Sequence, residues 1–171
     1  MLRSQLEHIL RASGAIADEG VFIVIGSQAI LASLDEPPAE LTVSLEADLY
    51  PRDAPEKADL ITGSIGEFSL FSETFGYHAD GVSPSTAVLP PSWPARLVTL
   101  QNENTGGVTG LCLSPADIAI SKLAAGRTKD LDYVSALLRH RIVTRPTLEQ
   151  LLEELTPEQR ILVEPRLRAM S

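Results

Sequence analysis

The sequence predicts an α/β (α+β) fold in which a mixed sheet of four or five strands is flanked by helices and followed by a helical C-terminal portion. The apolar, β-branched run Val21–Ile25 has the composition of a buried strand, and helix formers follow it at 28–32. Residues 96–113 contain two apolar runs around an Asn- and Gly-rich turn, which indicates a β-hairpin. Because hairpins join antiparallel strands and helical crossovers join parallel ones, we expect both directions in one sheet.

Turn residues and side-chain spacing define the elements of the first half. Ser4 and Glu7 have the spacing of a capping box, and Gly14 interrupts the helical pattern that begins there. Segment 41–50 alternates with period two, as a half-buried strand does, and Pro51 ends it. The expected elements are a helix at 4–12, a strand at 21–25, a helix at 28–32, a strand at 41–50, helices at 55–65 and 69–75, and a strand between 77 and 89.

The second half contains the clearest helix signals. Ser114 precedes Pro115, and Asp117 lies in the first turn, a combination typical of a helix N-terminus. Gly126 ends this helix, and Thr128 can cap the next one. The expected elements are strands at 96–100 and 108–113, and helices at 115–125, 129–140, 148–155 and 158–169.

Length and composition predict a single domain over residues 1–171, with a core at about 20–140 and C-terminal helices at 146–171. Apolar residues make up 44% of the chain and charged residues 22%, as in globular proteins. Cys112 is the one cysteine and lies in an apolar run, which excludes an intrachain disulfide and a Cys-rich zinc site. No apolar run approaches the ~18 residues that span a bilayer, so we expect a cytoplasmic protein without membrane association.

The net charge of −9 is unevenly distributed. Residues 1–80 contain 14 acidic and 4 basic residues, whereas residues 122–145 contain 2 acidic and 6 basic residues. The overall charge argues against a protein that coats nucleic acid through a basic surface, but it does not exclude a local basic site. We expect the acidic half and the basic segment to contribute two halves of one site.

Gly26 and Ser27 lie between a predicted strand and a predicted helix. Glycine lets the backbone approach a ligand closely, the serine offers a hydroxyl group, and a helix N-terminus favours anions, so phosphate is the expected ligand. The alternative is a turn that contains Gly and Ser for steric reasons alone.

Glu46 and Asp48 project from one side of their predicted strand because side chains alternate along it. Two carboxylates so close repel each other unless a cation or a base neutralises them. Mg²⁺ and Mn²⁺ prefer such oxygen ligands and also bind phosphate oxygens. The alternative is the exposed polar face of an edge strand.

A helix break within residues 122–130 gathers charged side chains. Arg127, Lys129 and Asp130 lie close to the start of the second helix, where an anion is favoured. Lys122 belongs to an otherwise apolar helix, an unusual place for a solvated lysine. The alternative is a solvated, charged connection between two helices.

Together these motifs resemble the nucleotidyltransferase-like fold, in particular bacterial domains of unknown function related to abortive-infection toxin nucleotidyltransferases. The resemblance rests on the Gly26-Ser27 turn, the strand with two carboxylates, and the segment from Leu113 to Asp130, and it covers about residues 20–140. It implies that a nucleoside triphosphate binds with Mg²⁺ or Mn²⁺ and that a nucleotidyl group passes to an acceptor, which in the toxins is often an RNA end.

The resemblance implies a role for each candidate residue. Glu46 and Asp48 would bind the metal ion; Gly26, Ser27, Arg127 and Lys129 would bind the nucleotide; and Asp48, Lys122 and Asp130 would be catalytic. Three features depart from the family pattern, the first being that Gln28 and Ala29 follow the Gly26-Ser27 turn, where the family often leads toward a basic residue. Glu46 stands where an aspartate is usual, and the candidate third carboxylate, Asp80, has neighbours that do not mark it as one.

The leading hypothesis is therefore a metal-dependent nucleotidyltransferase-like protein, acting on a nucleotide and an acceptor such as RNA in a toxin–antitoxin or defence system. The alternative is a catalytically degenerate binding module of the same fold, either antitoxin-like or a partner protein that forms oligomers, including homo-oligomers. The Glu46 substitution leaves open whether the chain is an active enzyme.

Overall fold

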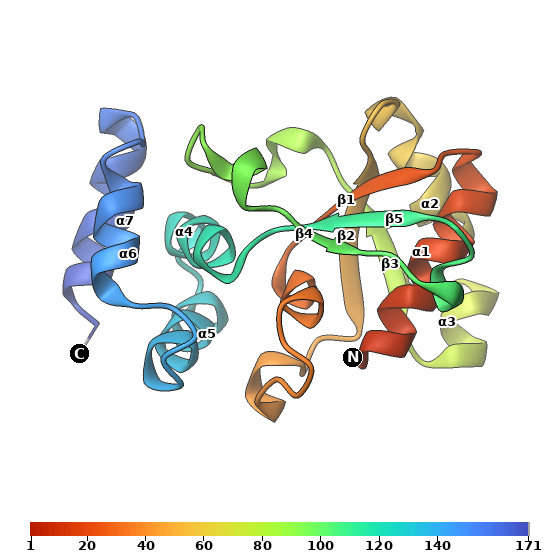
Figure 1. Ribbon diagram of the computed structural model, residues 1–171, viewed down its shortest axis with the longest axis horizontal. Helices are drawn as coiled ribbons and strands as arrows, with labels where there is room; N and C mark the ends of the chain where they lie inside the picture. The colour runs from red at the N-terminus through yellow and green to blue at the C-terminus, as the bar shows by residue number, and fades with distance from the viewer. Residues whose placement is uncertain (171) are drawn as a thin grey trace.

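The computed structural model describes residues 1–170, and within that range five strands form one sheet in the order β3-β2-β1-β5-β4 (Figure 1). The central strand β1 runs antiparallel to β2 and parallel to β5, while β2 pairs with β3 in parallel and β4 pairs with β5 antiparallel. The predicted mixed sheet is confirmed. The strands are β1 Val21–Ile25, β2 Glu46–Pro51, β3 His78–Gly81, β4 Val98–Leu100 and β5 Thr109–Cys112.

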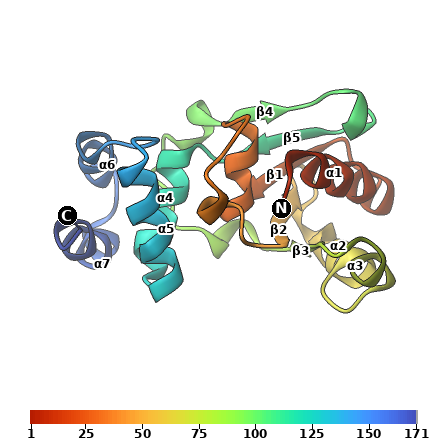
Figure 2. The ribbon, with the colours of Figure 1, turned by 90° about the horizontal axis from the view of Figure 1, so that it is seen from below.

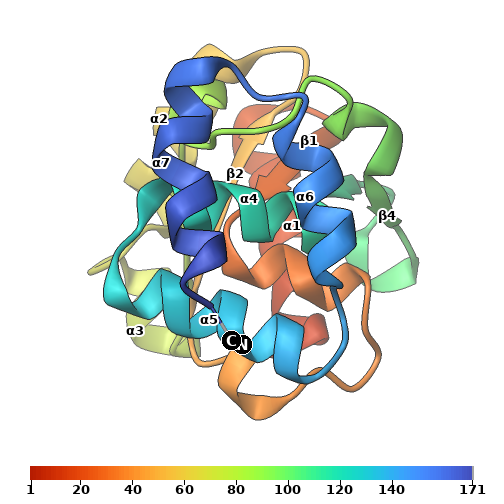
Figure 3. The same ribbon diagram turned by 90° about the vertical axis from the view of Figure 1, so that its left-hand side faces the viewer.

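Helices gather at two opposite ends of the molecule (Figures 1 and 2). Helices α1 to α3 lie together at one end, and α4 to α7 form the helical C-terminal portion at the other. Figure 3 shows α6 and α7 outside α4, with which both make contact. The helices are α1 Arg3–Ala17, α2 Ala58–Ile65, α3 Leu70–Phe75, α4 Pro115–Ala125, α5 Thr128–Arg139, α6 Arg145–Leu152 and α7 Pro157–Arg168.

The first helix differs most from its prediction. It continues through Gly14, because the missing side chain leaves room for Val108, whose Cγ2 would lie 2.4 Å from an added Cβ. The predicted capping box is wrong: Leu2 is the N-cap residue. Glu7 is buried instead, and its carboxylate accepts hydrogen bonds from the side chains of Asn102 and Asn104.

Two elements that lead into the site are shorter or tighter than predicted. The turn after β1 leads into a 3-10 helix, η1 (Ser27–Ala32), rather than an α-helix. The strand expected at 41–50 begins at Glu46, because Ala39–Leu41 forms a 3-10 turn and residues 42–45 are not in the sheet. The predicted helices in residues 55–75 and the strand after Tyr77 are confirmed.

The hairpin and the helices of the second half are confirmed with small boundary shifts. The Ser114 hydroxyl accepts a hydrogen bond from the Asp117 backbone N–H at 3.2 Å and caps α4, and Gly126 ends that helix with φ of 70°. The N-cap of α5 is Arg127 rather than Thr128, which is already the first helical residue.

The core lies between the sheet and the helices, and Cys112 on β5 is fully buried in it. Burial raises the pKa of its thiol to about 12, so the group stays protonated. Among residues 1–170, no helix combines the length and apolar character that crossing a membrane requires.

Candidate functional site

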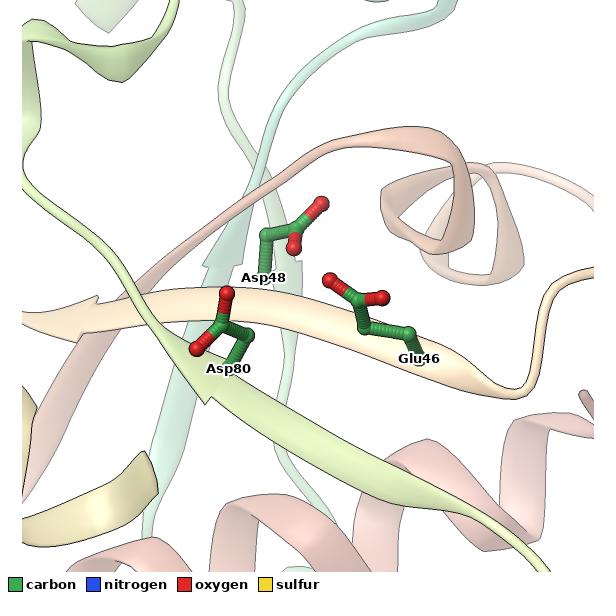
Figure 4. Close-up of side chains that lie close together, drawn as sticks. All are labelled: Glu46, Asp48 and Asp80. Atoms are coloured by element: carbon green, nitrogen blue, oxygen red, sulfur yellow. The ribbon is translucent and has the colours of Figure 1, made fainter. Parts of the chain in front are cut away.

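Three carboxylates converge at one edge of the sheet. Glu46 and Asp48 extend from β2 and Asp80 from β3, and each offers an oxygen within 4.8 Å of the others (Figure 4). All three residues are half-buried. The prediction that Glu46 and Asp48 share one face of a strand is confirmed, and Asp80 proves to be their neighbour.

The register of β2 and β3 explains this convergence. Asp48 is paired directly with Asp80 in the parallel ladder, and alternation places Glu46 on the same face one pair away. The Thr62 hydroxyl from α2 bonds an Asp80 carboxylate oxygen at 2.9 Å and so helps to orient it. The other face of β2 carries Ala47 and Leu49, which are fully buried and hold the strand in place.

The three carboxylates repel one another electrostatically. Burial raises the pKa of Asp48 to about 8, and a hydrogen bond to Glu46 and the charges of Glu46 and Asp80 act in the same direction. Lys122 opposes this rise without cancelling it. A divalent cation would relieve such crowding of negative charge, because it stabilises the ionised carboxylates.

The Gly26-Ser27 turn lies directly against Asp48. A Cβ added to Gly26 would lie 2.1 Å from Asp48 Oδ2, a distance that no real contact allows. Gly26 also has φ of 72° and ψ of −171°, a region that is almost exclusive to glycine. Close approach and backbone conformation therefore both require glycine at this position.

The basic segment is organised around Asp130, whose side chain is fully buried. Lys122 Nζ lies 2.9 Å from Asp130 Oδ1, and Arg127 Nε lies 2.6 Å from Oδ2. Burial works to raise the pKa of Asp130, but hydrogen bonds from Arg127 and Lys122 prevail and hold it below its usual value. The solvated-connection alternative is thereby wrong for Lys122 and Asp130.

One cleft of about 820 Å³ joins these groups. Its lining includes the acidic residues Glu46, Asp48 and Asp80, the turn residues Gly26 and Ser27, and the basic-segment residues Lys122, Arg127, Lys129 and Asp130. The acidic residues and the basic segment therefore line one cleft, and their shared function stays a prediction. Lys129 is exposed at this cleft.

Residues 2–170 match the model of a family described as a nucleotidyltransferase of unknown function (DUF6036). The chain belongs to this family. The resemblance to nucleotidyltransferase-like domains of unknown function is therefore confirmed. No curated protein and no solved structure matches the chain.

Two further residues of this nucleotidyltransferase family member contact Ser27, and neither was assigned a site role from the sequence. Tyr133 on α5 donates its hydroxyl to the Ser27 carbonyl at 2.8 Å. Gln28 is buried, and its Nε2 donates to Ser27 Oγ at 3.1 Å. The position of Tyr133 one turn after Asp130 was the available signal, because residues at i and i+3 share a helix face.

Proposed function

We propose that this protein binds a nucleoside triphosphate together with a divalent cation and transfers a nucleotidyl group to an acceptor. The observation that carries this proposal is the group of three carboxylates beside the Gly26-Ser27 turn. Membership in a nucleotidyltransferase family supports the same reaction class.

The residues present suit a hard divalent cation. Glu46, Asp48 and Asp80 offer oxygen atoms alone, the donor type that Mg²⁺ and Mn²⁺ prefer. The raised pKa of Asp48, which follows from burial and the neighbouring carboxylates, indicates negative charge without enough compensation. When bound, the cation would neutralise phosphate charge and favour displacement at phosphorus.

The remaining residues would position the nucleotide. Gly26 lets the backbone come close, and the Ser27 hydroxyl can donate to a phosphate oxygen. Arg127, Lys122 and Lys129 supply positive charge, while Asp130 holds the first two in place. In the reaction, the oxygen of the acceptor hydroxyl bonds to the α-phosphorus, the bond to the departing pyrophosphate breaks, and the hydroxyl proton passes to solvent.

For the acceptor we propose an RNA end, within a toxin–antitoxin or defence pair. This part rests on the resemblance to abortive-infection toxins. It is supported by the exposed Arg127 and Lys129 at the cleft, where they can meet a phosphate backbone.

Calorimetric titration with Mn²⁺, and then with each nucleoside triphosphate in Mg²⁺, tests the binding step. We expect Asp48→Asn to abolish cation binding and nucleotide binding, whereas the matched control Asp59→Asn, an exposed acid on α2, leaves both intact. Radiolabelled nucleotide and total RNA test the transfer step. Absence of binding heat together with unlabelled RNA would overturn the enzymatic proposal.

A binding module without catalysis is the second candidate. Glu46 places its carboxylate one methylene further from the backbone than the usual aspartate, and Asp130, which pairs with both Lys122 and Arg127, already offsets part of their positive charge. A stoichiometric protein partner would favour this candidate if it stayed bound to the Glu46→Ala/Asp48→Ala variant while the native protein bound no nucleotide.

A further inference from the structure

We propose that Tyr133 is a positioning residue for the nucleotide phosphates, which holds the Ser27 turn and the Lys122 ammonium group in one fixed arrangement. This inference rests on the proposed function, because it assigns Ser27 and Lys122 to the nucleotide. It concerns a side chain that lies beside these residues and acts through them.

The first contact fixes the backbone of the turn. The Tyr133 hydroxyl donates to the Ser27 carbonyl at 2.8 Å, across 106 positions of sequence. The carbonyl of Ser27 and the N–H of Gln28 belong to one planar peptide group and point in opposite directions. Holding the carbonyl therefore also sets the direction of that N–H and limits rotation of the turn.

A second contact involves the ring of the same tyrosine. Lys122 Nζ lies 4.6 Å from the centre of the Tyr133 ring, within the range of a cation–π interaction. Lys122 also pairs with Asp130, which lies on the same helix face as Tyr133. One face of α5 thus holds both the Lys122 ammonium and the Ser27 turn.

The surroundings keep Tyr133 in the state that this role requires. Its side chain is buried, and burial raises the pKa of the hydroxyl, so the group remains a hydrogen-bond donor. The next residue, Val134, and Leu137 one turn later are fully buried, which anchors this stretch of α5 in the core. This packing fixes the part of α5 from which the tyrosine reaches the turn.

Tyr133→Phe removes the hydroxyl and keeps the ring, so it isolates the contact with Ser27. Tyr77→Phe is the matched control, because Tyr77 is also buried and its hydroxyl hydrogen-bonds His8 Nδ1 at 2.7 Å outside the cleft. The measurements are Mn²⁺ affinity alone, nucleoside triphosphate affinity in saturating Mn²⁺, and the thermal midpoint. The hydroxyl does not touch the three carboxylates, so the two affinities should respond differently.

We expect Tyr133→Phe to weaken triphosphate binding about fivefold, the equivalent of one lost hydrogen bond, while Mn²⁺ binding stays unchanged. Tyr77→Phe should leave both affinities unchanged at a comparable thermal midpoint.

Equal triphosphate affinity in Tyr133→Phe and the native protein would overturn the inference and leave the proposed function standing. Parallel loss of both affinities would also overturn it, since it would indicate general distortion. A native protein that binds neither Mn²⁺ nor nucleotide would overturn the proposed function, and the inference with it.

Discussion

At Gly26 the backbone adopts a conformation with φ of 72°, and the Asp48 carboxylate occupies the space that a side chain would need. The two constraints have separate origins, because one is internal to the backbone and the other belongs to a neighbouring strand. They can therefore be separated by substitution.

Gly26→Ala should destabilise the protein by about 3 kcal/mol or more, since backbone strain and the clash with Asp48 Oδ2 add. Asp48→Ala removes the clashing carboxylate but not the strain, so in that background Gly26→Ala should cost less. Urea denaturation of the native protein, both single variants and the double variant measures this coupling. Additive effects would show that the turn does not press on Asp48.

Asp130 predicts a specific dependence of stability on pH. Its pKa lies below the usual value for an aspartate because hydrogen bonds from Arg127 and Lys122 outweigh the effect of burial. Its ionised form therefore stabilises the fold above pH 3.8, and this contribution disappears as pH falls through the lowered pKa.

Asp130→Asn should accordingly cost about 2 kcal/mol near pH 7, and the cost should shrink as the pH falls through the lowered pKa of Asp130, where the native carboxyl also becomes neutral. The Asp48 carboxyl is present in both the native protein and the Asp130→Asn variant. Its own effect on the pH dependence of stability, which has the opposite sign, therefore cancels when the two free energies of unfolding are subtracted. Chemical denaturation across this pH range gives the result. A constant difference between the two proteins would contradict the role assigned to the Asp130 ion pairs.

Among the elements, α4 carries Lys122 into the cleft, and a partly buried ion pair holds its N-terminus in place. Arg96 donates from Nε and Nη2 to the fully buried Asp117 carboxylate, at 3.1 and 2.7 Å, and the Ser114 hydroxyl contacts the same group. Ser114 and Asp117 were visible in the sequence as cap residues, but Arg96 belongs to a distant segment and was not.

Asp117→Asn should destabilise the protein by about 3 kcal/mol, because it leaves the half-buried Arg96 without its counter-charge. The surface pair of Arg52 and Asp53 provides the matched control, since Asp53→Asn breaks an exposed pair and should change little. Thermal unfolding of both variants measures the two losses of stability, and we expect a clearly larger loss for Asp117→Asn. Similar effects would mean that the Arg96 pair adds nothing beyond a surface pair.

The sequence predicted elements whose signals are local. Val21–Ile25 and the helix Pro115–Ala125 were recognised from composition and caps within a few residues. The full extent of the first helix was not recognised, because Gly14 is accommodated through contact with Val108, which lies far along the chain. The start of β2 was missed for a similar reason, since alternation continues into residues that pair with no strand.

At the scale of the whole molecule, the site assembles from segments that lie far apart in sequence. Alternation alone placed Glu46 and Asp48 on one face, but Asp80 joins them through the register of β2 and β3, which no local pattern specifies. The contact of Tyr133 with Ser27 was missed for the same reason, because the two residues are 106 positions apart in the sequence. Local chemistry was therefore predictable, and its tertiary partners were not.

Cation binding at this site should stabilise the entire fold, because an ion that binds the folded state alone shifts the unfolding equilibrium. Mn²⁺ at one hundred times its dissociation constant should add about 2.7 kcal/mol to the free energy of unfolding. Differential scanning calorimetry with and without Mn²⁺ measures this. The Asp48→Asn variant should show no increase, and an equal increase in that variant would place the ion elsewhere.

The burial of Cys112 makes the protein well suited to site-specific labelling. Its thiol is inaccessible and protonated, so maleimide reagents should leave the native chain unmodified. A Val43→Cys substitution, at an exposed position that lines the cleft and has no proposed role in binding, would then provide the sole reactive thiol and could carry a fluorophore there. Ligand entry could thus be followed in real time by its emission, without first replacing a native cysteine.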